Sequence, residues 1–457
     1  MRTLLRSHLR FFLLAALSGL ALRLLFLFAF PAITADSFIY GDIAKNWLRH
    51  GVYGVTDGGI VTPTYIRLPG YPAFLAVVFS IFGMEHYRAV LVIQILIDLA
   101  SCFLIADMAR RLFSDRAAKV AFLIAALCPF FANYAAAALT ETLEIFFTTL
   151  ALNFAICELS DWQNRGLRGW VWCGLSLACA ILLRPDGGLL LAAIGGYLAV
   201  LTIISLVRKT PASSSYYLRA ALLVASVALA PLIPWSLRNV HTLHRFEPLA
   251  PRYANAPDEF VPLGFNRWVR TWMVDYASVE ELYWAVPGNS LDASKLPSRA
   301  FDSAAEQDET EQLLDDYNDQ LHVTPELDVR FAKLASDRIH TSPVRYYLWL
   351  PLARITDMWL RPRTEILPSD SRWWEFDDDP KWSVLAVGSG LVNLLFVGTA
   401  VAGLGKRRSF PLWGFLLAFL ILRSAFLGSL ENPETRYTLE CYPVVILLSC
   451  RVFSPKS

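Results

Sequence analysis

The stretch TYIRLPGYPAFLAVVFSIFGMEHYR, residues 64–88, contains an apolar run that is short for a membrane span. A helix from Gly70 to Gly83 would be about 21 Å long, whereas the hydrocarbon core of a bilayer is about 30 Å thick and needs about 20 residues. Runs of this length usually lie in an interface or re-enter the membrane. Whether this run crosses the membrane decides the side on which every later loop lies.

Longer apolar runs recur along the 457-residue chain, of which 55% is hydrophobic and only 18% charged. This composition excludes a soluble globular protein. The net charge of +1, without a basic stripe, gives no indication of nucleic-acid binding. All seven cysteines lie inside apolar runs, so neither a disulfide framework nor a zinc site is predicted. The full-length runs lie at roughly 11–31, 88–108, 118–133, 139–158, 169–183, 187–207, 218–235, 383–404, 410–427 and 438–453.

The distribution of basic residues indicates that the run at 70–83 does not cross. Basic residues collect in the short cytoplasmic loops of membrane proteins. If the run stays outside, the cytoplasm receives most basic clusters, among them Arg165 with Arg168 and the group 406–408. If the run crosses, the basic loop ARRLFSDRAAK at 109–119 lies outside. The sequence therefore predicts an all-α polytopic membrane protein with about ten transmembrane helices and both termini in the cytoplasm.

The segment SPVRYYLWLPLARITDMWLRP, residues 342–362, is a second helix that we expect to lie at the outer surface of the membrane. Arg354 and Asp357 lie near its middle, where each charge would cost about 2.5–3.5 kcal/mol inside a bilayer. In the hydrophilic region before it, Thr324 and Pro325 predict a helix over 325–340. The expected domains are a membrane module at 1–235 with a first outer loop at 32–87, a partly helical extracytoplasmic loop at 236–381, and C-terminal transmembrane helices at 382–457.

Charged residues collect where the predicted spans meet the outer face. Asp36 follows the first span, and Arg67 precedes the short helix at 70–83. Each has an ordinary interpretation, Asp36 as a helix N-cap and Arg67 as an arginine that reaches from the interface to water. Because a carboxylate facing lipid is costly, we expect Glu141 or Glu144 to face a polar cavity. The other members of the set are Tyr40, Arg184, Asp186, Arg238, Asn239, Glu434, Arg436 and Tyr437.

Acids and arginines on one face of a membrane suit group transfer from a phosphate-linked lipid. The arginines would stabilise the departing phosphate as its charge develops, with bidentate contacts that suit a phosphate group. A carboxylate would accept the proton of the acceptor. The set therefore favours a transferase.

The motifs that contain these residues resemble those of the GT-C superfamily of polytopic glycosyltransferases. The resemblance is to the branch of protein O-mannosyltransferases and lipid A aminoarabinose transferases. Ser37 stands where many relatives have glutamate, which weakens the case for a metal at that point. Leu68 stands where they have proline, so a different local geometry is expected there. The matching motifs are Asp36 with Tyr40, Ala44, Leu48 and Gly51, then RLPGYPAF at 67–74, Glu141, RPD at 184–186, PWSLRN at 234–239 and ETRY at 434–437.

The resemblance implies an integral membrane glycosyltransferase that moves a sugar from a polyprenyl phosphate to an acceptor hydroxyl, with inversion, on the extracytoplasmic face. Asp36 would be the catalytic base, Glu141 a second active-site acid, and Arg67 a ligand of the carrier phosphate. Tyr40, Arg184, Arg238, Arg436 and Tyr437 complete the expected donor-binding set. No cofactor is expected, and a divalent cation is not indicated. The acceptor, whether lipid, glycan or protein, stays open, and the expected location is the bacterial inner membrane.

A transporter or lipid-handling membrane protein is the alternative. Transporters usually carry polar residues at the midplane of broken helices and have paired repeats, whereas this chain has charges at the rim and no evident repeat. Arg23, deep in the first span, is the main feature that suits the alternative. In the transferase interpretation, Arg23 would reach toward the carrier phosphate.

Overall fold

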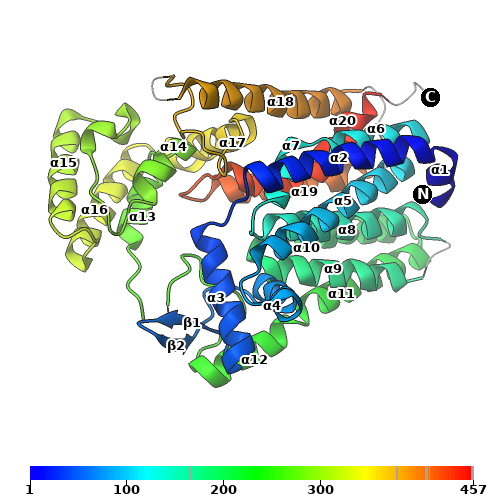
Figure 1. Ribbon diagram of the computed structural model, residues 1–457, viewed down its shortest axis with the longest axis horizontal. Helices are drawn as coiled ribbons and strands as arrows, with labels where there is room; N and C mark the ends of the chain where they lie inside the picture. The colour runs from blue at the N-terminus through cyan, green and yellow to red at the C-terminus, as the bar shows by residue number, and fades with distance from the viewer. Residues whose placement is uncertain (164–165, 257, 377–378, 407–409, 411, 454–457) are drawn as a thin grey trace. The chain divides into compact units, whose positions relative to one another are not determined.

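The computed structural model describes the chain except residues 164–165, 257, 377–378, 407–409, 411 and 454–457 (Figure 1). Arg165, Arg407 and Arg408 of the topology prediction lie outside the described residues. Helices dominate the rest of the chain, and the named strands form a single antiparallel hairpin, β1 (Gly54–Asp57) with β2 (Ile60–Pro63). The predicted all-α class is confirmed.

The chain forms two compact units. The first unit consists of Met1–Pro257, Phe396–Arg423 and Leu439–Ser457, and the second of Asp258–Leu395 and Ser424–Thr438. The helices of the first unit up to residue 257 are α1 (Arg2–Ser7), α2 (Leu9–Ala29), α3 (Ala35–His50), α4 (Gly70–Phe82), α5 (Tyr87–Leu112), α6 (Asp115–Ala126), α7 (Pro129–Ala135), α8 (Glu141–Ser160), α9 (Arg168–Leu183), η1 (Pro185–Gly187), α10 (Gly188–Val207), α11 (Pro211–Leu229) and α12 (Leu232–Leu243).

Near the C-terminus, α18 (Pro380–Leu404), α19 (Trp413–Gly428) and η6 (Thr435–Cys441) each contain residues of both units, and α20 (Tyr442–Arg451) belongs to the first. The helices of the second unit are α13 (Leu263–Val269), α14 (Tyr276–Ser278), η2 (Val279–Tyr283), η3 (Ala293–Lys295), η4 (Ser298–Ala300), α15 (Ala304–Asn318), α16 (Pro325–Thr341), η5 (Arg345–Trp349) and α17 (Leu350–Leu360).

Six helices in the described part of the chain are long and apolar enough to cross a membrane. They are Leu9–Ala29, Tyr87–Leu112, Glu141–Ser160, Pro185–Val207, Pro211–Leu243 and Pro380–Leu404. Helices α6 and α7 meet at a 50° bend and are a seventh candidate if together they form one broken span. The remaining predicted spans fall on the shorter helices α9, α19 and α20, and their crossing stays a prediction.

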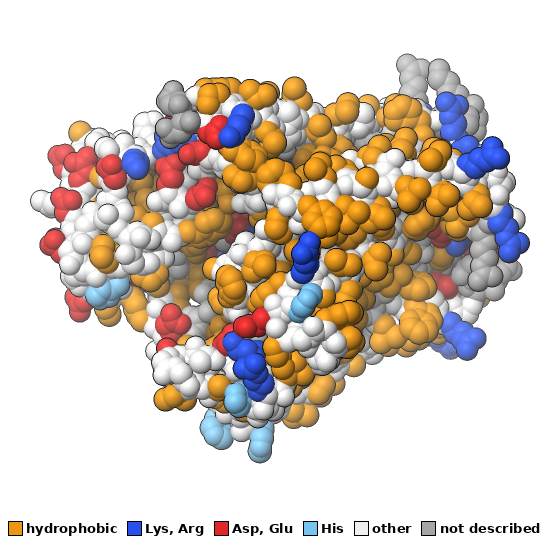
Figure 2. Space-filling model, viewed as in Figure 1, with side chains coloured by type: hydrophobic (Ala, Val, Ile, Leu, Met, Phe, Trp, Pro, Cys, Tyr) orange, Lys and Arg blue, Asp and Glu red, His pale blue; other side chains and the backbone are white. Residues whose placement is uncertain are grey.

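Hydrophobic side chains cover α2 on the face shown in Figure 2. Leu14 and Phe28, for example, are each 65% exposed, which is the surface expected of a helix that faces lipid. The other side of α2 carries an ion pair: Arg23 Nε donates to Asp98 Oδ2 on α5 at 2.6 Å, and Arg23 Nη1 donates to the Ala126 carbonyl at 2.6 Å. Arg23 is fully buried by these contacts, so the interpretation that it reaches toward a carrier phosphate is wrong.

The short helix α4 follows Pro69 and has 13 residues, and α17 has 11; neither is among the six span candidates. Gly70 lets the start of α4 touch the end of α9, since a Cβ at this position would be 2.6 Å from the carbonyl of Leu182. This approach brings the loop that carries Arg67 to the segment that carries Arg184. The surface location of α4 and α17 at a membrane stays a prediction.

The second unit has its own hydrophobic core. Trp268 and Trp272 pack there with Phe331 and other apolar side chains of α13, α15 and α16. The helix predicted at 325–340 is confirmed as α16, whose N-cap Thr324 accepts a hydrogen bond from the backbone N–H of Leu327 at 3.3 Å. Arg354 of α17 is fully buried and donates to the Met273 carbonyl at 2.8 Å.

Candidate active site

Helix α3 holds Asp36 in its first turn but does not use it as the cap. The N-cap is Thr34, whose backbone N–H donates to the Ser37 hydroxyl at 3.0 Å. The interpretation of Asp36 as the N-cap is therefore wrong. The carboxylate instead accepts a hydrogen bond from Arg67 Nη2, with 2.8 Å between Nη2 and Oδ1. The side chains are 33% and 19% exposed, so this ion pair is accessible to a ligand.

The loop before α4 holds Arg67 between α3 and the hairpin. Its guanidinium lies over the ring of Tyr40, 5.6 Å from the centroid. Its carbonyl accepts a hydrogen bond from the Tyr53 hydroxyl at 2.9 Å. Asp36, Tyr40 and Arg67 are thus brought together, although 31 residues separate the two charged members in the sequence.

Tyr40 connects this pair with a second charged group. Its ring packs edge-to-face on Tyr71, with the centroids 5.1 Å apart. Burial raises the pKa of Tyr40 to about 12. The positive charges of Arg67 and Arg184 act to lower this pKa, whereas the carboxylates of Asp36 and Glu141 act to raise it. The phenol therefore stays neutral at physiological pH and can donate a hydrogen bond but cannot serve as a base.

The second group surrounds Arg184, the residue that follows α9. Its Nε donates to Asp186 Oδ1 at 3.1 Å and lies 3.5 Å from Glu144 Oε2. Its Nη1 lies 3.8 Å from Glu141 Oε1. Glu141 and Glu144 open α8 and are 1% and 0% exposed, so both carboxylates face the protein interior, in keeping with the expectation that at least one of them avoids lipid.

Arg423 and Glu440, which the sequence analysis did not identify, complete this group. Arg423 belongs to α19. Its Nη2 atom is 3.0 Å from Asp186 Oδ2 and 2.8 Å from Glu440 Oε2. The same nitrogen is 3.8 Å from Glu144 Oε1. A charged residue inside an apolar run is rare unless it is paired, and that signal could have found Arg423 in the run at 410–427. We call Glu141, Glu144, Arg184, Asp186, Arg423 and Glu440 the carboxylate–arginine cluster.

Arg238 of α12, predicted to bind the donor, contacts the two residues that flank the hairpin. Its two terminal nitrogens donate to the carbonyls of Thr64 and Tyr53, each at 2.6 Å. The guanidinium also lies over the rings of Tyr53 and Trp235. Because Tyr53 in turn binds the carbonyl of Arg67, these contacts of Arg238 support the loop on which Arg67 lies.

Arg436 and Tyr437 belong to the second unit, where Glu434 binds both. Arg436 Nε is 2.6 Å from Glu434 Oε2, and the Tyr437 hydroxyl donates to Glu434 Oε1 at 2.5 Å. The guanidinium of Arg436 lies over the Tyr437 ring, 5.2 Å from its centroid. The three residues form one compact polar group within that unit.

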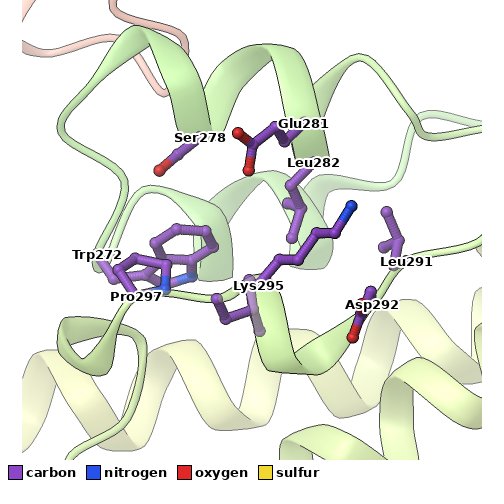
Figure 3. A pocket seen from close by; sticks show the side chains of 9 residues that line it. Trp272, Ser278, Glu281, Leu282, Leu291, Asp292, Lys295 and Pro297 are labelled. Atoms are coloured by element: carbon purple, nitrogen blue, oxygen red, sulfur yellow. The ribbon is translucent and has the colours of Figure 1, made fainter. Parts of the chain in front are cut away.

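No set of three or more His, Cys, Asp or Glu side chains has the arrangement of a metal site in the described part of the chain. A cavity of the second unit, drawn in Figure 3, is lined by Trp272, Glu281, Asp292 and Lys295 among others and has a volume of about 30 Å³. That volume holds about two water molecules. Glu281 also forms an ion pair with Arg372: Arg372 Nη2 donates to Glu281 Oε2 at 2.8 Å. The cavity is too small for a sugar.

Comparison with known proteins gives a family match over residues 63–235, to the family described as dolichyl-phosphate-mannose-protein mannosyltransferase. The matched segment includes Arg67, Glu141 and Arg184 but begins after Asp36 and ends before Arg423. No curated protein sequence matches the chain.

Solved structures with a similar fold include two of the oligosaccharyltransferase of Archaeoglobus fulgidus. The complex of this enzyme, AglB, with an inhibitory peptide and a dolichol-phosphate is 14% identical, with a TM-score of 0.52 over 97% of this chain and 50% of that one. The structure tethered with an acceptor peptide is 13% identical, with a TM-score of 0.53 over 97% and 49%. ArnT from Cupriavidus metallidurans bound to undecaprenyl phosphate aligns at 15% identity and a TM-score of 0.42, over 96% and 77%.

The chain thus spans about half the length of the archaeal chains whose fold it shares. Because the identity is low, the similarity to the archaeal structures supports the fold alone. The family match supports a similarity in sequence over residues 63–235. The two findings agree with the resemblance that the motifs indicated. The chain is similar over residues 63–235 to the dolichyl-phosphate-mannose-protein mannosyltransferase family and has the membrane fold of the archaeal oligosaccharyltransferase.

Proposed function

We propose that the chain transfers a sugar from a polyprenyl-phosphate donor to an acceptor hydroxyl on the extracytoplasmic face of the membrane, with inversion at the anomeric carbon. The observation that carries this proposal is the accessible ion pair of Asp36 with Arg67, which lies over Tyr40. The archaeal structure that shares the fold holds a dolichol-phosphate, which supports a lipid-phosphate carrier.

Arg67 is the proposed ligand of the carrier phosphate. A guanidinium binds phosphate oxygens through parallel N–H groups and is always charged. Arg67 Nη2 donates to Asp36 Oδ1 at 2.8 Å. A bound phosphate would compete for this donor and loosen the carboxylate from its partner. Donor binding would in this way prepare Asp36 to accept a proton.

Asp36 is the proposed general base. The acceptor oxygen forms a bond to the anomeric carbon, and the bond from that carbon to the phosphate oxygen breaks. The electron pair of the broken bond leaves with the polyprenyl phosphate, whose growing charge Arg67 stabilises. The proton of the acceptor hydroxyl passes to Asp36. One displacement of this kind inverts the configuration of the sugar.

The carboxylate–arginine cluster borders this centre through Arg184, whose charge reaches the Tyr40 phenol. We propose Glu141 as the second active-site acid, since it lies 3.8 Å from Arg184 and its charge also acts on Tyr40. Arg436 and Tyr437, held by Glu434, stay proposed donor ligands of the second unit. The acceptor could be a lipid, a glycan or a protein.

The test is transfer by the purified protein in vesicles that contain labelled polyprenyl-phosphate sugars and candidate acceptors. We expect acceptor-dependent release of polyprenyl phosphate, lost in Asp36→Asn and kept in Asp57→Asn. Asp57 is an exposed aspartate of the hairpin and serves as the matched control. Movement of labelled lipid between leaflets without any transfer would contradict the proposal and favour the transporter alternative.

A further inference from the structure

We infer that Arg423 is a positioning residue that keeps Arg184 beside Glu141 by neutralising the deeper carboxylates of the cluster. This inference rests on the proposed function. It concerns a residue outside the matched family segment and outside every motif quoted from the sequence.

The cluster has one accessible member and a buried remainder. The side chain of Arg184 is 19% exposed, whereas Arg423 is 2% exposed and Glu440 is 0% exposed. Glu144 is also fully buried. Arg184 is therefore the member of the cluster that a donor or acceptor could meet, and Arg423 acts only through other side chains.

Asp186 holds Arg184 through both carboxylate oxygens. Arg184 Nε donates to Oδ1 at 3.1 Å, and Nη2 donates to Oδ2 at 3.4 Å, so the orientation of the guanidinium plane is fixed. Asp186 Oδ2 also accepts from Arg423 Nη2 at 3.0 Å. The two arginines thus share one carboxylate, and the position of Asp186 depends on both.

The charges of the cluster show why a second arginine is needed. Within the six residues of the cluster, Glu141, Glu144, Asp186 and Glu440 provide four carboxylates against two guanidiniums. Arg423→Met would leave these four carboxylates with Arg184 as the one guanidinium of the set and so increase the excess of carboxylates. In a buried site with a low dielectric constant, such an excess attracts the remaining cation strongly.

Arg184 would then be drawn from its accessible position toward the deep carboxylates. Glu144 gives the direction of that movement, since it lies between the two arginines, 3.5 Å from Arg184 and 3.8 Å from Arg423. The guanidinium would leave Glu141, and the centre would lose a cation near the reacting atoms. A displacement of about 1 Å at such a site costs about 100-fold in rate.

The test compares kcat and KM for the donor in the full-length protein in vesicles. We expect Arg423→Met to lower kcat by about 100-fold, with a much smaller effect on KM for the donor, because Arg67, the proposed phosphate ligand, lies outside the cluster. Arg423→Met combined with Glu440→Gln should recover most of the lost kcat, since the second change removes the carboxylate that the first leaves without a cation. Arg423→Lys should recover part of it because it keeps the charge.

Arg23→Met combined with Asp98→Leu is the matched control, since it removes an equally buried ion pair outside the cluster. We expect this variant to change the melting temperature but to keep the wild-type kcat. If Arg423→Met does not fold, the isosteric Asp186→Asn carries the test and should also lower kcat, because Arg184 loses the partner that orients it.

A folded Arg423→Met or Asp186→Asn with wild-type kcat would overturn the inference. So would a loss of kcat in Arg423→Met that Glu440→Gln leaves unchanged, because charge balance would then not be the cause. Failure of the wild type to transfer any tested sugar would instead overturn the proposed function.

Discussion

Replacement of Asp36 by asparagine separates its proposed chemistry from every structural role that the side chain has. Asparagine has nearly the same shape, and the N-cap of α3 is Thr34, so the helix keeps its cap. The substitution removes the charge that Asp36 contributes to its ion pair with Arg67. Because both side chains of that pair are partly exposed, the pair contributes about 0.2–1 kcal/mol.

The expected loss of activity is much larger than this loss of stability. General-base catalysis contributes about 10²–10⁴-fold, which corresponds to about 2.7–5.4 kcal/mol in the activation free energy. We therefore expect Asp36→Asn to lower kcat by about 10²–10⁴-fold. A stability change of about 1 kcal/mol lowers the melting temperature by only a few degrees.

Donor binding gives the sharper readout. In the proposed site, a carrier phosphate would compete with Asp36 for Arg67, which donates to Asp36 in the structure. Asparagine carries no charge and competes less, so Asp36→Asn should bind the donor at least as tightly as the wild type does. The assay measures the Kd of a polyprenyl-phosphate sugar, the rate of transfer, and thermal unfolding in the same vesicles. Wild-type transfer, or weaker donor binding together with loss of folding, would refute the reasoning and leave Asp36 a structural partner of Arg67.

Four further predictions follow from the geometry. Arg67→Lys should weaken donor binding and Arg67→Ala should weaken it more, because lysine keeps the charge but lacks the fork; unchanged affinity in Arg67→Ala would show that Arg67 is only an interfacial anchor. Tyr40→Phe should leave the alkaline limb of the kcat profile unchanged up to about pH 10, since the pKa of Tyr40 is raised to about 12 and the phenol is neutral below that value; a shifted limb would contradict this. Gly70→Ala should lower the free energy of unfolding by about 1–3 kcal/mol, because its Cβ would lie 2.6 Å from the Leu182 carbonyl; thermal unfolding checks this, and Gly195→Ala, at an open position without a positive φ, is the comparison. Cysteines introduced at Glu85 and Lys406 should react with an impermeant reagent from opposite sides, and labelling of both from one side would contradict the topology.

The sequence predicted the helical class and the position of most helices because apolar run length follows directly from bilayer thickness. The cap at Thr324 was also predictable, since Thr-Pro before an amphipathic segment is a local signal. The break between α6 and α7 was not predicted. Its 50° bend interrupts a run that reads as one continuous apolar segment. Composition does not record such a bend.

The candidate site was predictable only where its residues belong to local motifs. Asp36, Arg67, Glu141 and Arg184 were named from the sequence, and the structure pairs Asp36 with Arg67 and brings Glu141 within 3.8 Å of Arg184. The pairing of Arg423 with Asp186, 237 residues away, could not be derived, because no periodicity relates residues on separate membrane helices. The hydrogen bonds of Arg238 to the carbonyls of Tyr53 and Thr64, which flank the hairpin, could not be derived from the sequence either.

The ion pair of Arg23 with Asp98 has a consequence for the order in which the chain enters the membrane. The ribosome makes Arg23 75 residues before its partner, so α2 reaches the insertion machinery when α5 does not yet exist. An unpaired arginine at the centre of a span costs about 2.5–3.5 kcal/mol. The strongly apolar remainder of α2 can offset that cost, but the charge stays uncompensated until Asp98 arrives on α5. Stable integration of the first span therefore depends on the second, and a nascent chain truncated before residue 98 should be retained at the translocon longer than one truncated after α5.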